Sequence, residues 1–142
     1  MTAFARPFAA LAMCAFLAGC GSSNLAEVSG RVMLRGQPVT HGTIQFFPER
    51  SRPASAEIGP DGRYTLATFQ SGDGALVGTH KVTITSSRSI PIGSHAANVD
   101  PEAPGVRYRR EWDVPSQYAE LATSGLTAEV QRGSNVIDFD LP

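Results

Sequence analysis

Cysteine is nearly missing from this sequence. The 142 residues contain two, Cys14 and Cys20, and both lie within the first twenty residues. The rest of the chain has no thiol with which to form a disulfide. Its stability therefore has to come from a hydrophobic core.

Charge of either sign is also scarce. Lysine and arginine together number 12 and aspartate and glutamate 13, which leaves a formal net charge of −1. Neutralising the phosphates of a nucleic acid takes a surplus of basic side chains. The composition thus gives no electrostatic reason to expect DNA or RNA as a partner.

Long apolar runs are absent except for one short stretch, residues 8–17. This run is too short to cross a bilayer, which takes about 20 residues. Arg6 precedes it and small residues follow at positions 18 and 19, an order typical of a secretory signal. We expect residues 1–19 to be a cleaved signal peptide. The alternative, a buried N-terminal helix, is disfavoured because the run has no polar face and no cap.

The end of this run, Leu17-Ala18-Gly19-Cys20, resembles the lipobox of bacterial lipoproteins. In that family the cysteine thiol receives a diacylglycerol, the chain is cut before the cysteine, and the new amine is usually acylated. Two or more acyl chains hold a protein firmly on a membrane, whereas one gives only marginal binding. The resemblance implies a lipidated Cys20, a short tether over residues 20–24, and, because no aspartate follows the cysteine, delivery to the outer membrane.

From residue 25 onward, apolar and polar residues alternate with a period of two, which is typical of half-buried strands. About seven short segments show this pattern, and Pro60-Asp61-Gly62 predicts a β-hairpin turn within residues 54–69. The residues expected to face inward are Val28, Val32 and Leu34, Ile44 and Phe46, Tyr64 and Leu66, Val82 and Ile84, and Ile137, Phe139 and Leu141. The pattern predicts an all-β antiparallel sandwich over residues 25–142.

Residues 87–116 interrupt the alternation. They contain four prolines and two glycines, and they show no sustained period. We expect a long loop here, and loops of more than about 12–15 residues within a compact domain are usually functional or disordered.

The strand motifs resemble a known family. Gly30-x-Val32, the Gly36 to Gly42 turn, Ile44-x-Phe46 and the Asp61 to Leu66 segment are similar to the carboxypeptidase regulatory-like, or transthyretin-like, domain. A closer resemblance is to small planctomycete lipoproteins of that type, with the segment from Gly72 to Ile84 and an ending that runs from Pro115 and Tyr118 through residues 123–127 to Asn135 and residues 138–141. The resemblance implies a seven-stranded Greek-key β-sandwich and a non-catalytic role in the cell envelope.

Sequence patterns typical of catalytic or metal-binding sites are few. His41, His80 and His95 lack the close pairing that zinc sites usually show, so we expect exposed polar side chains. No serine stands in a Gly-x-Ser-x-Gly elbow. Asp138 and Asp140 share a strand face. They could form an acid–base pair or bind a cation, but we expect them to be the solvated face of an edge strand. We expect no enzyme activity, no metal and no cofactor.

Lys81 and Asn135 raise the alternative of a Lys–Asn isopeptide bond, as in sandwiches of the collagen-adhesin B type. In that type the lysine belongs to the first strand, whereas Lys81 comes late in the chain. We expect no such bond.

The segment RYRREW is the candidate binding surface, and its residues are Arg107, Tyr108, Arg109, Arg110 and Trp112. Guanidinium groups and aromatic rings together bind anionic or sugar ligands by charge and stacking. The alternative is a soluble loop whose Trp112 packs on the edge of the sandwich. Among the aromatic residues, Tyr118 is a further candidate for sugar contact.

These observations predict a lipid-anchored envelope module with a non-catalytic binding or scaffolding role, performed by loops at one end of the fold. Its expected partners are the membrane, through Cys20, and an envelope protein or polysaccharide. Two narrower roles remain open. One is a carbohydrate-binding module, and the other is an accessory subunit of an envelope complex.

Overall fold

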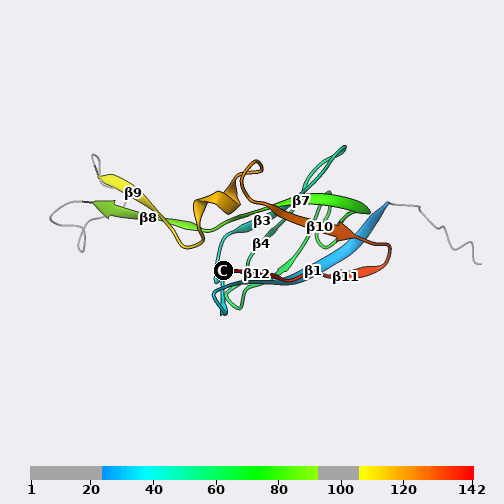
Figure 1. Cartoon of the computed structure of the whole chain (residues 1–142), viewed down its shortest axis with the longest axis horizontal. Helices are drawn as coiled ribbons and strands as arrows, with labels where there is room; N and C mark the ends of the chain where they lie inside the picture. The colour runs from blue at the N-terminus through cyan, green and yellow to red at the C-terminus, as the bar shows by residue number, and fades with distance from the viewer. Residues whose placement is uncertain (1–23, 93–105) are drawn as a thin grey trace, which may run out of the picture.

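A computed structural model describes residues 24–92 and 106–142 (Figure 1). The expected signal peptide, Cys20, His95 and the middle of the expected loop lie outside the described residues. Within them the regular structure is β-strand apart from one short 3-10 helix, so the all-β prediction is confirmed. No helix in this part of the chain has the length and apolar character that crossing a membrane requires.

The first sheet is centred on β1 (Leu25–Leu34). Three short strands pair with β1 in the antiparallel sense, and two pair with it in the parallel sense. The antiparallel strands are β2 (Gln37–Pro38), β5 (Arg63–Thr65) and β6 (Ala75–Leu76), and the parallel strands are β11 (Ser134–Val136) and β12 (Phe139–Leu141). The strands flanking β1 are broken into short pieces, and residues 87–112 contain two further strands, so the described residues form twelve strands in place of about seven.

The second sheet is antiparallel throughout, in the order β10-β7-β3-β4. Its strands are β3 (Thr43–Pro48), β4 (Ala54–Glu57), β7 (Gly78–Thr85) and β10 (Leu126–Val130). Figure 1 shows this sheet as one layer and β1 with β11 and β12 as the other.

One hydrophobic core lies between the two sheets. Phe46 of β3 is fully buried and its ring contacts the rings of Tyr64 and Phe139 from the first sheet, at centroid distances of 6.3 and 6.0 Å. Most of the residues expected to face inward are buried, and Leu34 and Ile137 are partly buried against the core. Burying one such side chain stabilises a fold by about 1.5–3 kcal/mol, so the alternating apolar residues together favour packing of the two sheets against each other.

Parallel pairing of the first and last strands departs from the fully antiparallel arrangement expected. β11 and β12 keep one register along β1, and the pairing is interrupted between them, opposite Gly30. There the carbonyl of Ile137 turns toward Gly30, where an added Cβ would lie 1.8 Å from the Ile137 oxygen. The Tyr64 hydroxyl donates to this carbonyl at 2.5 Å, and Asp138 Oδ1 accepts from the Arg31 N–H at 2.8 Å. Gly30 is therefore required because only glycine leaves room for this turned peptide.

The expected hairpin over residues 54–69 forms only in part. The turn at residues 59–62 and one bridge between Ser55 and Ala67 are present. Beyond the turn, however, β4 pairs with β3 in the second sheet while β5 pairs with β1 in the first. The segment thus crosses between the layers, because each strand buries its apolar face on its own sheet.

The prediction of a loop over residues 87–116 is wrong for the described part of this segment, which contains strands. This segment contains β8 (Ser87–Ile92) and β9 (Arg107–Trp112), and a 3-10 helix, η2 (Ser116–Ala119), begins at its last residue. β8 and β9 form a two-stranded antiparallel sheet, named here the ribbon. The alternation that identifies strands elsewhere is missing because the ribbon has no buried face, and every residue of β9 is exposed.

The ribbon projects from one end of the molecule, and β1 begins at the other (Figure 1). At the N-terminal end Leu25 of β1 pairs with Leu76, and Ser134 at the start of β11 pairs with Glu27. The start of the described chain and the candidate binding segment therefore lie at opposite ends of the long axis of the molecule.

Candidate functional site

Strand register divides the five candidate residues between two faces of the ribbon. Neighbouring residues of a strand point to opposite faces, so Tyr108, Arg110 and Trp112 share one face, which we call the aromatic face. Arg107 and Arg109 lie on the other. The sequence cluster is therefore two surfaces rather than one site.

The aromatic face is open. Tyr108 is 43 % exposed and Trp112 is 37 % exposed, and the Arg110 guanidinium lies 5.5 Å from the centroid of the Trp112 ring. Small side chains stand opposite, since Trp112 pairs with Ser87 and Arg110 pairs with Ser89. Two rings with a guanidinium between them can stack on a flat or sugar ring and bind an anionic group beside it.

The opposite face has a different composition. Arg107 pairs with Ile92 and Arg109 with Ile90, and Arg88 forms an ion pair of 3.7 Å with Glu111. This face offers charge without an exposed ring. It therefore provides a matched comparison for any binding that depends on stacking.

Asp113 joins the ribbon to the two-sheet body. Its N–H donates to the carbonyl of Ser86 at 3.0 Å, and its carboxylate lies 3.2 Å from both Arg88 of the ribbon and His41 of the body. The next residue, Val114, is buried in the core. The root of the ribbon is thus fixed while its outer part stands in solvent.

Ser86 also lies at this root. The Ser86 hydroxyl is buried and has no hydrogen-bond partner among the described residues, so it is not activated by His41. His41 is about half exposed and pairs with Asp113.

One histidine and one tyrosine that we expected to be exposed are buried. His80 packs against the Phe46 ring at 5.7 Å, and its Nε2 lies 2.6 Å from the Leu76 carbonyl oxygen. Its position in strand alternation, two residues before Val82, was the signal for this placement. Tyr118 is buried on η2, which removes it from the candidates for sugar contact.

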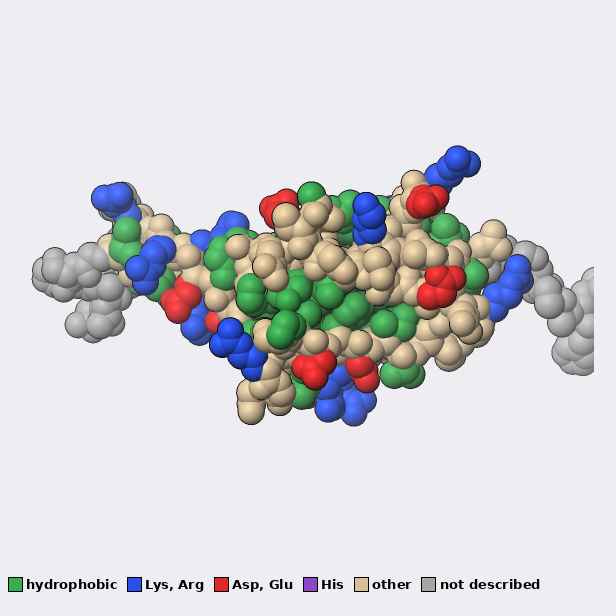
Figure 2. Space-filling view, viewed as in Figure 1, with side chains coloured by type: hydrophobic (Ala, Val, Ile, Leu, Met, Phe, Trp, Pro, Cys, Tyr) green, Lys and Arg blue, Asp and Glu red, His purple; other side chains and the backbone are tan. Residues whose placement is uncertain are grey.

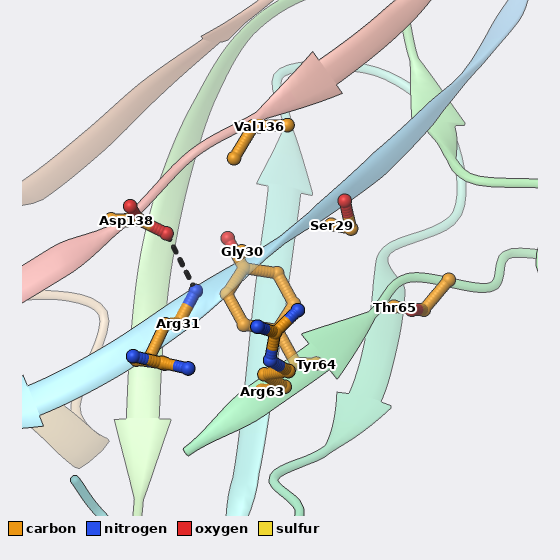
Figure 3. Close-up of a pocket in the computed structure, with 8 residues that line it drawn as sticks. All are labelled: Ser29, Gly30, Arg31, Arg63, Tyr64, Thr65, Val136 and Asp138. Atoms are coloured by element: carbon orange, nitrogen blue, oxygen red, sulfur yellow. Dashed lines mark hydrogen bonds between the residues drawn. The ribbon is translucent and has the colours of Figure 1, made fainter. Parts of the chain in front are cut away.

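A hollow of about 540 Å³ lies on the outer face of the first sheet (Figure 3). It is lined by Ser29, Gly30, Arg31, Arg63, Tyr64, Thr65, Val136 and Asp138. Sequence reasoning missed this hollow, although two small neighbours within β1, Ser29 and Gly30, were its signal. An adjoining hollow of about 340 Å³ extends it along β1.

The polar side chains that line this hollow make hydrogen bonds and an ion pair within the protein. Asp138 accepts from the Arg31 backbone, and Arg63 is paired with Asp61 at 3.1 Å. Burial, and then the charge of Asp138, raises the pKa of Tyr64 well above its ordinary value, so its hydroxyl remains a donor to the Ile137 carbonyl. The hollow therefore has a polar lining whose side chains are held by contacts within the protein.

The remaining candidates lie apart. Lys81 is on β7 of the second sheet, whereas Asn135 is on β11 of the first, where its Nδ2 donates to the carbonyls of Glu27 and Gln131. Asp140 is exposed on β12. The described residues contain no group of three histidine, cysteine, aspartate or glutamate side chains that could hold a metal ion.

Comparisons of the chain with protein-family models, with curated proteins and with solved structures found no match. The ribbon and the hollow therefore have to be interpreted from their own geometry and chemistry.

Proposed function

We propose that this protein is a non-catalytic binding module of the bacterial cell envelope, anchored in the outer membrane by a lipid on Cys20. In this proposal residues 1–19 are the signal peptide, and the two sheets are a transthyretin-like Greek-key β-sandwich. The module exposes the aromatic face of its ribbon to an envelope polysaccharide that carries acidic groups. The resemblance of residues 17–20 to a lipobox and of the strand motifs to the transthyretin-like family supports the first two statements.

The open aromatic face carries the binding proposal. Exposed rings with small residues opposite them leave room for a sugar ring, and Arg110 supplies a charge that pairs with a carboxylate or phosphate. Acidic polysaccharide fits this combination better than a neutral one, because its carboxylate or phosphate groups pair with the guanidinium of Arg110. The ribbon also stands at the end away from the start of β1, so a protein anchored at Cys20 would extend it from the membrane (Figure 1).

The anchor is tested by Cys20→Ser in the full chain expressed in a bacterium. We expect the wild-type protein in the membrane fraction, with an intact mass that includes the lipid. The variant should shift to soluble or unprocessed material. An unmodified thiol on an uncut chain, or unchanged fractionation of the variant, would show that Cys20 is not the anchor.

Binding is tested by sedimenting the detergent-solubilised protein with an insoluble polysaccharide that carries carboxylate or phosphate groups. We expect the double variant Tyr108→Ala/Trp112→Ala to bind about tenfold more weakly, which corresponds to about 1.4 kcal/mol. Arg110→Ala should also weaken binding and reduce its dependence on salt. The matched control, Arg107→Ala/Arg109→Ala, removes two charges from the opposite face and should bind much as wild type does.

Equal weakening by the control would mean that charge in general, rather than the aromatic face, attracts the polymer. Unchanged binding by all variants would remove the ribbon from consideration. Recovery of one protein partner after crosslinking, without polysaccharide binding, would favour the accessory-subunit role instead.

A further inference from the structure

Three loops gather at the end of the body where β1 begins. Loop 68–74 leads into β6, which pairs with the start of β1. Loop 131–133 leads into β11, whose first residue pairs with Glu27. Loop 49–53 follows the end of β3, where Pro48 pairs with His80 near the start of β7. We call this surface the tether end.

Loop 68–74 is built to hold a phenylalanine outward. The Asp73 carboxylate accepts N–H bonds from Thr68 at 2.6 Å and from Phe69 and Gln70 at 2.9 Å each. The Thr68 hydroxyl donates to the Gly74 carbonyl at 2.7 Å. Despite this ordered backbone, the Phe69 side chain is 64 % exposed and has the Arg52 guanidinium 5.9 Å from its ring centroid.

The charges of these three loops are mainly basic. Arg50, Arg52 and Arg132 are exposed, against the carboxylates of Glu49 and Asp73. The Asp73 carboxylate already receives three backbone N–H groups, which reduces its repulsion of an outside anion. Figure 2 shows basic side chains at this end of the molecule, together with hydrophobic and acidic ones.

We propose that the tether end docks on the surface of an anionic bilayer, with Phe69 at the level of the lipid headgroups and the three arginines against their phosphates. This inference rests on the proposed lipid at Cys20. An extended chain spans at most about 3.6 Å per residue, so the steps from Cys20 to Leu25 reach no farther than about 18 Å. A lipidated cysteine thus keeps the tether end within that distance of the bilayer.

Proximity makes a weak contact sufficient. Because the lipid already holds the protein at the membrane, docking is an intramolecular event with a high effective concentration. An aromatic ring with an adjacent guanidinium is suited to the membrane–water interface. There the apolar ring can contact the lipid while the cationic group stays in water or contacts a phosphate. Docking would also fix the orientation of the molecule, so that the ribbon points away from the bilayer.

The test uses the lipidated full chain in vesicles of phosphatidylcholine and phosphatidylglycerol, with bromine on the acyl chains near the headgroups. Trp112 is the one tryptophan of the sequence and lies on the ribbon, so wild type serves as the reference. The test variant is Phe69→Trp in a Trp112→Phe background. We expect brominated lipid to quench the indole introduced at position 69 strongly and to leave the Trp112 emission of wild type almost unchanged.

Adding Arg50→Ala, Arg52→Ala and Arg132→Ala to the test variant should reduce the quenching, while Arg107→Ala with Arg109→Ala should not. Equal quenching at positions 69 and 112, with the protein still floating with the vesicles, would overturn docking but leave the anchor intact. Failure of the wild-type protein to float with the vesicles would overturn the anchor, and the docking inference with it. A far-ultraviolet spectrum of each variant confirms that it is folded.

Discussion

In the body of the molecule each long strand hides one of its faces, as in β3, where Ile44 and Phe46 are fully buried. In the ribbon all six residues of β9 are exposed. Packing therefore dictates the side chains of the body but not those of the ribbon. The rings and arginines of β9 contribute little to the core, which makes them available for an external ligand. The difference predicts that substitutions in the body change stability, whereas substitutions in the ribbon change binding.

The largest expected effect is in the core of the body. Phe46→Ala removes the ring that contacts Tyr64, His80 and Phe139. Truncating a buried phenylalanine to alanine typically lowers the free energy of unfolding by about 3–5 kcal/mol. Denaturant unfolding measures this loss, and a change below about 1 kcal/mol would contradict the assignment of Phe46 to a single shared core.

Tyr64→Phe tests the turned peptide at Ile137. The variant keeps the ring but removes the hydroxyl that donates to the Ile137 carbonyl, which lowers the free energy of unfolding by about 1–3 kcal/mol. The raised pKa of Tyr64 also gives this residue a pH signature. Its contribution to stability is present below the ordinary tyrosine pKa of about 10 and declines as the pH rises above that value, because the unfolded chain ionises first.

Denaturation at a series of alkaline pH values separates these two contributions. Wild type should lose stability above about pH 10 more steeply than Tyr64→Phe does. Parallel curves for the two proteins would show that Tyr64 ionises as readily in the folded state as in the unfolded chain.

A smaller effect is expected at the boundary of body and ribbon. Asp113→Asn weakens the contacts with Arg88 and His41, and partly exposed ion pairs of this kind contribute about 0–1 kcal/mol. Hydrogen exchange should report faster exchange for the amides of β8 and β9 and unchanged protection in β3 and β7. Faster exchange throughout the protein would mean that Asp113 supports the body as well.

The smallest effect is expected within the ribbon. Arg107→Ala with Arg109→Ala should change the free energy of unfolding by less than about 0.5 kcal/mol, as exposed positions usually do. Thermal unfolding of this variant beside wild type measures the difference. A loss of several kcal/mol would show that the ribbon packs on a surface that these side chains help to cover.

The alternation of apolar and polar residues predicted the inward faces of the body strands well, because burial of one face is the cause of that alternation. Val28 and Val32, or Phe139 and Leu141, could be assigned to an inward face without knowledge of any partner strand. Parallel pairing of β12 with β1 could not be predicted in this way, since it joins residues 107 positions apart, such as Val32 and Phe139. Register between distant strands depends on the whole chain path rather than on local pattern.

The ribbon and the hollow could not be predicted for a different reason. Ile90 pairs with Arg109 on one face of the ribbon, and Trp112 pairs with Ser87 on the other, so both faces mix apolar and polar side chains and no period is visible. The five candidate residues were identified by their chemistry, but their division between two faces needed the register. The hollow around Gly30 depends on a turned peptide more than 100 residues away in the chain.

Ser86 links the central strand β7 directly to β8 of the ribbon. β7 is held along its length by β3 on one side and β10 on the other, and β1, which follows the tether, is likewise held on both sides. If a bound polymer moved relative to the membrane, the tension would run along these two strands and load their hydrogen bonds in shear. Pulling single molecules between the tether and the ribbon would measure this resistance as one high rupture force rather than a series of small ones.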